Sequence, residues 1–168
     1  MRPAAARVNP RRAGRIGAAL VLLMLALLAG AFWWPRSDAS PHALRPDDAA
    51  VLAVGVRVYA QHCASCHGAR GEGQPNWRER GPDGLLPAPP HDDSGHTWHH
   101  PDEQLFALTK HGLAKVIGQP DYRSAMPAYD GVLSDQEIVA VLSWIKAQWP
   151  PQAWRHQDQV NAQAARGR

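Results

Sequence analysis

Cysteine is scarce in this sequence, and its first 37 residues contain no acidic side chain. Only two cysteines occur among the 168 residues, three positions apart, so a network of disulfides cannot stabilise the fold. Five arginines lie before residue 16, whereas all 15 acidic residues follow residue 37. The other 13 bases leave the chain from Arg36 onward with a net charge of −2. Because a nucleic-acid surface needs clustered positive charge, this distribution argues against nucleic-acid binding despite the overall pI of about 9.2.

The sequence also has no internal repeat and no alternating apolar pattern long enough for a sheet. Apolar residues recur instead at helical spacing. A first helix is expected to begin at Asp47 or Asp48 and to run into Cys63, and a short second helix lies between Pro101 and Gly112. The sequence therefore predicts an all-α domain with three or four helices and long loops.

The last helix of this domain has the clearest start. Ser134 and Glu137 are spaced as a capping box, and Leu133 can pack on Ile138 as a hydrophobic staple. The apolar stripe continues to Trp149. Two prolines follow at once and are expected to end the helix.

An uncharged run of 19 residues, 16–34, precedes the domain. As a helix it is long enough to cross the hydrocarbon core of a membrane. The arginines of residues 1–15 are expected to hold the N-terminus in the cytoplasm, and the aromatic end of the run matches a membrane interface. The domain then lies on the periplasmic side of the inner membrane. A cleaved signal peptide is the alternative, because Ala29-Gly30-Ala31 offers a small-residue cleavage site.

The remaining boundaries follow from composition. Residues 35–46 contain three prolines and are expected to form a short linker, residues 47–150 form the folded domain, and residues 151–168 form a polar C-terminal tail. Within the domain, residues 68–95 hold six glycines and five prolines, too many for regular structure. Because such loops bury little apolar surface, they do not readily offset their conformational entropy. Something other than helix packing is expected to fill the interior.

The sequence Cys63-Ala64-Ser65-Cys66-His67 has the spacing that covalent haem attachment requires. On one helical turn, each sulfur can form a thioether to a vinyl group of the porphyrin while the imidazole reaches the iron. A redox-active dithiol uses the same spacing on an alternating strand and helix scaffold, and a structural zinc site normally joins two separate pairs of ligands. The sequence shows neither pattern. Haem attachment explains all three residues together.

Residues 47–150 resemble the mono-haem class I c-type cytochromes, in a membrane-anchored form. Besides the cysteine motif, the resemblance rests on five residues of the first and last helices: Gly55, Tyr59, Val141, Trp144 and Ile145. It implies helices and long loops around one covalently bound haem, with the glycine allowing the first and last helices to cross closely. Glycine has no side chain, so a close approach is physically possible there.

A count of the methionines restricts the candidates for the second axial ligand of the iron. Met1 starts the chain, Met24 lies in the uncharged run, and only Met126 belongs to the domain. Its loop resembles the loop that carries the sixth ligand in this family. The alternative is a buried, gap-filling methionine, which suits a lone methionine beside a proline in a polar loop poorly. We therefore expect His67 and Met126 to ligate the iron.

A group of histidines lies before the second helix: His91, His96, His99 and His100. These side chains can bind a metal such as copper or supply another haem ligand. The favoured interpretation is simpler, namely that they cap the second helix and hydrogen-bond near a haem propionate. The resemblance also places the backbone carbonyl that orients His67 in the proline-rich stretch 86–90.

Together these features predict a one-electron carrier. A thioether and an imidazole raise the reduction potential relative to two imidazoles and close the iron to substrates, so neither a catalytic residue nor a small-molecule substrate is expected. The resemblance implies redox protein partners: membrane respiratory or dehydrogenase complexes as donors, and an oxidase or other periplasmic acceptor. The alternatives are a haem-based sensor or peroxidase-like enzyme with a labile Met126, a cytochrome subunit of a larger oxidoreductase complex, and a zinc module.

Overall fold

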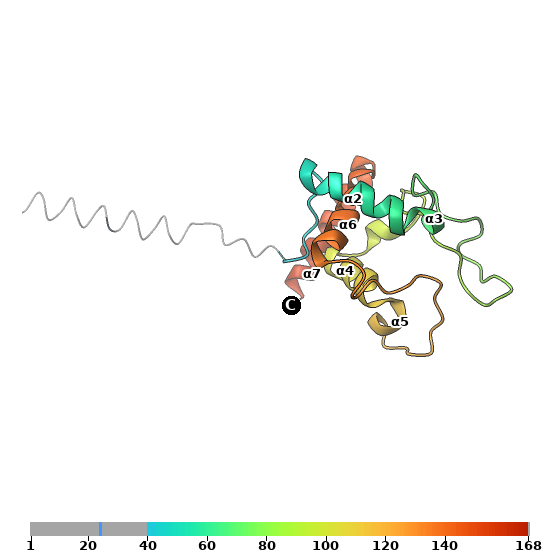
Figure 1. The fold of residues 1–168 in the computed structure, drawn as a ribbon. Helices are drawn as coiled ribbons and strands as arrows, with labels where there is room; N and C mark the ends of the chain where they lie inside the picture. The colour runs from blue at the N-terminus through green and yellow to red at the C-terminus, as the bar shows by residue number, and fades with distance from the viewer. Residues whose placement is uncertain (1–23, 25–39, 168) are drawn as a thin grey trace, which may run out of the picture. The chain divides into compact units, whose positions relative to one another are not determined.

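The computed structural model describes residue 24 and residues 40–167. Its domain contains, in chain order, α2 (Ala49–His62), α3 (Ala64–His67), the 3-10 helix η1 (Thr97–His99), α4 (Asp102–His111), α5 (Leu113–Val116), α6 (Asp135–Ala147) and α7 (Pro151–Arg166) (Figure 1). No strand occurs in these residues. The all-α fold is therefore confirmed, with more helices than the three or four that the sequence predicts.

Helices α2 and α6 cross in the middle of the domain (Figure 1). At the crossing, a Cβ atom built on Gly55 lies only 2.2 Å from the Ala140 carbonyl oxygen and 2.7 Å from the Trp144 Cβ. The ring of Tyr59 packs beside the crossing, with its centroid 4.5 Å from that of Trp144. The close crossing is confirmed, and it requires glycine because any side chain overlaps the facing helix.

Local sequence signals set several helix ends. The Asp48 carboxylate accepts hydrogen bonds from two amides in the first turn of α2. Ser134 and Glu137 form the predicted capping box at the start of α6. Gly112 ends α4 with a φ of 80°, a conformation that glycine adopts without strain. These three predictions are confirmed.

The hydrophobic core lies among α2, α4, α6 and the start of α7. Its buried members are Val58, Tyr59, Leu105, Phe106, Tyr129, Leu133, Ile138, Val139, Val141, Leu142, Ile145, Trp149 and Ala153. Within the described residues, the loop 68–95 contributes no buried side chain to this core, and the loop between α5 and α6, 117–134, contributes only Tyr129 and Leu133 near its end. Most of both loops therefore depends on other contacts for its stability.

The sequence predicts a polar tail after residue 150, and this prediction is wrong because α7 packs against the domain. Gln157 is fully buried. Its amide nitrogen donates to the Asp102 carboxylate (2.5 Å), and its amide oxygen accepts from the Lys146 ammonium (2.7 Å). Asn161 donates to the same Asp102 carboxylate (2.9 Å). Buried polar groups hold α7 on the domain through hydrogen bonds, so the polar composition of residues 151–168 does not reveal that they pack there.

The predicted linker is also wrong in its second half. Residues 40–46 lie on the domain: the His42 ring stacks on Phe106 with the ring centroids 3.6 Å apart, and the His42 Nδ1 lies 2.9 Å from the Glu103 carboxylate. The Leu44 amide also donates to a side chain of α4. The folded unit therefore begins with this segment, at Ser40, and not after it. Aromatic stacking and hydrogen bonds across long sequence separations fix a stretch that composition alone marks as irregular.

Except for residue 24, the predicted membrane segment, 16–34, lies outside the described residues. The basic segment, 1–15, and residues 35–39 also lie outside them. Among the residues that the structure describes, no helix has both the length and the apolar character needed to cross a membrane.

Candidate functional site

The cysteine and histidine motif lies at the junction of α2 and α3. Cys63 directly follows α2, and its amide donates to the Tyr59 carbonyl (2.9 Å). The amide of His67 in turn donates to the Cys63 carbonyl (2.9 Å). The Cys63 side chain is half-buried and the Cys66 side chain is exposed. One helical turn therefore presents two thiols and an imidazole.

The electrostatics of the motif argue against the redox-dithiol interpretation. Burial raises the pKa of the Cys63 thiol to about 11, and the negative charge of a Cys66 thiolate contributes a smaller part of this shift. A reactive dithiol needs the opposite shift, toward a thiolate at neutral pH. The zinc interpretation lacks support as well, since no group of three or more His, Cys, Asp or Glu side chains among the described residues is arranged to hold a metal ion.

His67 is held in one orientation by the proline-rich loop. Its Nδ1 donates to the Pro89 carbonyl at 2.8 Å, which confirms that the orienting carbonyl comes from residues 86–90. Burial lowers the pKa of His67, against the opposing effect of this hydrogen bond. The imidazole is therefore neutral at physiological pH. With Nδ1 donating, Nε2 carries the lone pair that a metal ligand needs.

His91 covers one face of the His67 ring. The two rings stack, with centroids 3.9 Å apart and planes inclined by 24°. The His91 backbone is fixed on both sides, because its amide donates to the Gly71 carbonyl (2.7 Å) and its carbonyl accepts from the Trp149 indole (2.7 Å). His91 is thus part of the packing around His67, and its own Nδ1 is buried without a hydrogen-bond partner.

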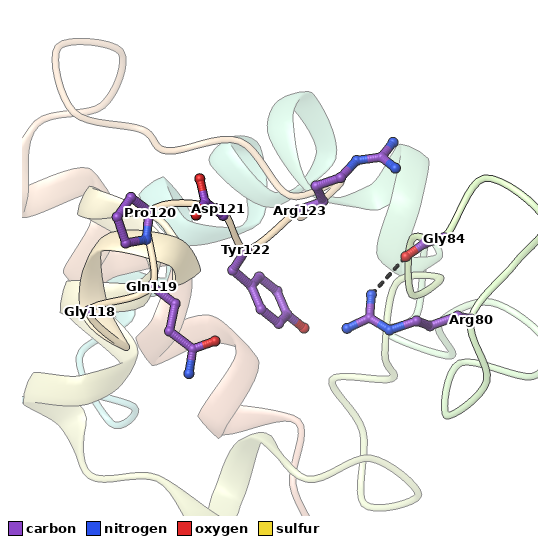
Figure 2. Close-up of a pocket in the computed structure, with 8 residues that line it drawn as sticks. All are labelled: Arg80, Gly84, Gly118, Gln119, Pro120, Asp121, Tyr122 and Arg123. Carbon is purple, nitrogen blue, oxygen red and sulfur yellow. Dashed lines mark hydrogen bonds between the residues drawn. The ribbon is translucent and has the colours of Figure 1, made fainter.

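A cavity of about 610 Å³ opens between two loops (Figure 2). One wall is formed by Arg80 and Gly84, and the other by residues 118–123. This volume lies in the range of roughly 300–1,000 Å³ that is typical of small-molecule and cofactor sites.

Both walls of the cavity lead to predicted iron ligands. The first loop closes at its base, where the Gln74 amide donates to the Ala88 carbonyl (2.9 Å), next to the Pro89 that orients His67. The second wall, residues 118–123, continues directly into the segment that carries Met126. The cavity therefore lies between the loop tied to His67 and the loop that leads to Met126.

The side chains on these loops fit a haem. Large apolar side chains are exposed on both: Leu86 is 36 % exposed on the first, and Ile117 and Met126 are 40 % and 38 % exposed on the second. An apolar macrocycle bound between the loops would cover this surface. Removal of apolar surface from water is the dominant favourable contribution to such binding. The donor set, a neutral imidazole nitrogen with a thioether sulfur and two thiols for attachment, also matches c-type haem chemistry.

Met126 lies outside the hydrophobic core, which argues against the gap-filling alternative. Its amide donates to the Ser124 hydroxyl (3.1 Å), which shapes the turn that carries it. The assignment of Met126 as the second axial ligand stays a prediction, as does the attachment of haem to Cys63, Cys66 and His67.

The other histidines before α4 are engaged in aromatic packing. His96 stacks on Trp77 with parallel rings 5.4 Å apart, and His99 stacks on Trp98 at 3.8 Å. His100 lies 3.3 Å from the Gln104 side chain. The N-cap of α4 is Pro101 and no side chain caps the helix with a hydrogen bond, so the expectation that these histidines cap it is wrong. Neither copper binding nor alternative haem ligation gains support from these contacts.

The sequence does not single out the polar residues of the cavity, Arg80, Tyr122 and Arg123. Arg80 and Arg123 lie far apart in the chain, and no motif or spacing connects them. The only signal is the presence of basic and aromatic side chains in loops whose other residues are mainly small, apolar or proline.

Comparison with known protein families matched residues 50–145 to the family described as cytochrome c oxidase, cbb3-type, subunit III. No solved structure matched the chain. The matched region runs from the first turn of α2 to near the end of α6, and it includes the motif, both loops of the cavity and Met126. The chain therefore belongs to the cbb3-type cytochrome c oxidase subunit III family, whose c-type cytochrome domain holds covalently bound haem c with its iron.

Proposed function

We propose that this protein is a one-electron carrier whose haem iron is ligated by His67 and Met126. Haem-based electron transfer in general follows from its family. The observation that carries the finer proposal is the neutral His67, locked by the Pro89 carbonyl. Pro89 lies at the base of a loop that lines a cavity together with residues 118–123, the segment just before Met126.

Each residue of the proposed site has a distinct role. The thiols of Cys63 and Cys66 anchor the porphyrin from one helical turn, and His67 presents Nε2 to one face of the iron. Met126 closes the opposite face with its thioether. When bound, the haem supplies an iron that changes oxidation state by one electron. With a side chain on each face, the iron would offer no open position to a substrate, which would favour electron transfer over bond chemistry.

Replacement of Met126 by alanine tests this ligation. We expect the oxidised variant to lose the weak near-infrared absorption of a methionine-ligated ferric haem, and its reduction potential to fall because a thioether favours ferrous iron. Val132→Ala is the matched control, since Val132 is an exposed apolar residue between α5 and α6 that does not line the cavity. An unchanged near-infrared band and potential in Met126→Ala contradict the assignment.

The sensor or peroxidase-like alternative requires an open distal face. The histidines at positions 96–100 are the evident source of a distal acid or base, and aromatic stacking engages His96 and His99. If the unmodified ferrous protein binds carbon monoxide readily while Met126→Ala behaves identically, the alternative is correct and the carrier proposal is wrong.

We further propose that the partners are redox proteins at the periplasmic face of the inner membrane, with residues 16–34 as the anchor. The support is the uncharged 19-residue run behind five arginines, and a family name that describes an oxidase subunit. Assembly into a larger oxidoreductase complex is compatible with the same proposal.

The anchor is tested by fractionation of cells that express the full chain. We expect the haem-stained protein to remain with the membranes after a high-salt wash, because burial of an apolar helix is insensitive to ionic strength. Recovery of a soluble protein that begins near Phe32 contradicts the anchor and supports the cleaved signal peptide.

A further inference from the structure

The hydrogen bond from the His67 Nδ1 to the Pro89 carbonyl leaves one motion of the His67 ring unrestrained. The bond fixes the position of the Nδ1 atom, but donors approach a carbonyl oxygen over a broad range of angles. The ring can therefore tilt about its Cβ–Cγ bond and still keep the hydrogen bond. A contact on the face of the ring restrains this tilt. Among the described residues, the aromatic ring stacked on that face is His91, with the ring centroids 3.9 Å apart.

The His91 ring is itself held in place. Tyr59 meets it edge-on, with the ring centroids 6.0 Å apart and the planes inclined by 61°. Tyr59 is fully buried, and its hydroxyl donates to the Gly68 carbonyl (2.9 Å). The backbone of His91 is bonded on both sides, to the Gly71 carbonyl and to the Trp149 indole. His91 therefore gives the neighbouring imidazole a fixed surface to lie against.

Histidine at position 91 carries an energetic cost that an apolar residue avoids. Its Nδ1 is buried without a hydrogen-bond partner, and a buried polar atom in this state loses solvation that nothing replaces. A leucine fills a similar volume without that loss, but its branched side chain has no flat face. A flat ring is therefore kept where a branched apolar side chain packs with less loss of solvation, which indicates a use for the face of the ring.

We propose that His91 is a positioning residue that sets the plane of the His67 imidazole on the haem iron. This inference rests on the proposed function, and within it on ligation by His67 alone, not on Met126. The Pro89 carbonyl restrains the ring at one atom and the His91 ring restrains its tilt, so the two contacts together fix its orientation. Contacts of this kind around a metal ligand orient the ligand and tune the metal.

The test compares His91→Leu and His91→Phe with the unmodified ferric holoprotein. Proton NMR of the four haem methyl groups is the measurement, because their paramagnetic shifts depend on the plane of the axial imidazole. His91→Phe keeps a flat face against His67, so we expect the methyl shifts to keep their order and spread. His91→Leu removes that face, so we expect their spread to change.

His156→Leu is the matched control for the leucine variant. The His156 ring on α7 meets the rings of Trp98 and His99 edge-on, each with the centroids 5.1 Å apart, and it does not stack on His67. The same substitution there removes an aromatic contact of another histidine. We expect the methyl shifts of this variant to match those of the unmodified protein.

A pair of tryptophan variants tests the same proposal without a change to the stacked ring. Trp149→Phe removes the indole N–H that donates to the His91 carbonyl. We expect it to change the methyl spread in the same direction as His91→Leu, but less. Trp98→Phe is its control, because the Trp98 Nε1 is buried without a hydrogen-bond partner and its loss breaks no hydrogen bond. If the His91 variants do not mature with haem, this pair decides the question.

Three results overturn the inference and leave the carrier proposal intact. The first is a His91→Leu holoprotein with the methyl shifts of the unmodified protein. The second is a His91→Phe holoprotein that departs from the unmodified protein as far as His91→Leu does. The third is a Trp149→Phe holoprotein whose shifts equal those of Trp98→Phe.

Other results bear on the proposed function. A Met126→Ala variant that changes neither the near-infrared band nor the potential overturns the ligation by Met126, and the test of His91 is unaffected. An unmodified protein without haem overturns both the carrier proposal and the role of His91.

Discussion

A double variant in which Cys63 and Cys66 are both replaced by serine is expected to carry no covalently bound haem after expression with haem-attachment machinery. Serine offers a hydroxyl where thioether formation needs a sulfur, so both links are lost. Haem staining of a denaturing gel measures the effect, because only covalently attached haem survives denaturation. We expect staining to disappear from the double variant and to weaken in each single variant.

Ser65→Ala provides the matched control for this experiment. Ser65 lies between the two cysteines, is exposed, and reaches only the Cys66 sulfur, at 3.9 Å. Its replacement keeps the helical turn and both thiols, so staining is expected to match that of the unmodified protein. If the double serine variant stains as strongly as this control, the cysteines do not attach the cofactor.

A leucine at Gly55 is expected to destabilise the holoprotein by about 2 kcal/mol or more through overpacking. Even the Cβ of a side chain at this position overlaps the Ala140 carbonyl oxygen, 2.2 Å away. A backbone atom is in the way, so repacking of a flexible side chain does not relieve the overlap. Helix α2 must move away from α6, which also shifts the end of α2 that leads into the cysteine motif. Thermal unfolding followed by circular dichroism measures the loss.

Ala53→Leu serves as the control on the same helix. Ala53 is exposed, and surface substitutions of this kind usually change stability by less than about 0.5 kcal/mol. An unfolding temperature for Gly55→Leu equal to that of Ala53→Leu rules out the close crossing of α2 and α6.

Features that depend on a few neighbouring residues are the ones the sequence predicts well. The capping box at Ser134, the Asp48 cap and the Gly112 stop each require only a short stretch of chain. The glycine crossing at Gly55 comes from the resemblance to cytochromes, since nothing local to α2 identifies its partner helix.

Helix α7 and the segment 40–46 are not predictable in the same way. Gln157 is buried because Asp102 and Lys146, distant in the sequence, satisfy its amide. In the sequence, a polar residue that is buried through such a network cannot be distinguished from a surface residue. The polar composition of residues 151–168 therefore indicates a tail. The stacking of His42 on Phe106 is equally non-local.

The candidate site divides along the same line. Its attachment motif is local, and counting methionines isolates Met126. The resemblance to cytochromes places the carbonyl that orients His67 within residues 86–90, and the structure shows that it belongs to Pro89. The cavity lined by Arg80 and Arg123 forms where two long loops approach each other. No pattern of residues in either loop predicts that approach.

The central claim is that haem is attached to the polypeptide through the two cysteines. Mass spectrometry of the tryptic peptide 58–70 tests it most directly, because this peptide contains the whole motif and is unaffected by processing at the N-terminus. We predict the mass of the peptide plus one haem, with haem absorption at the same retention time. A peptide of unmodified mass from fully matured protein contradicts the claim.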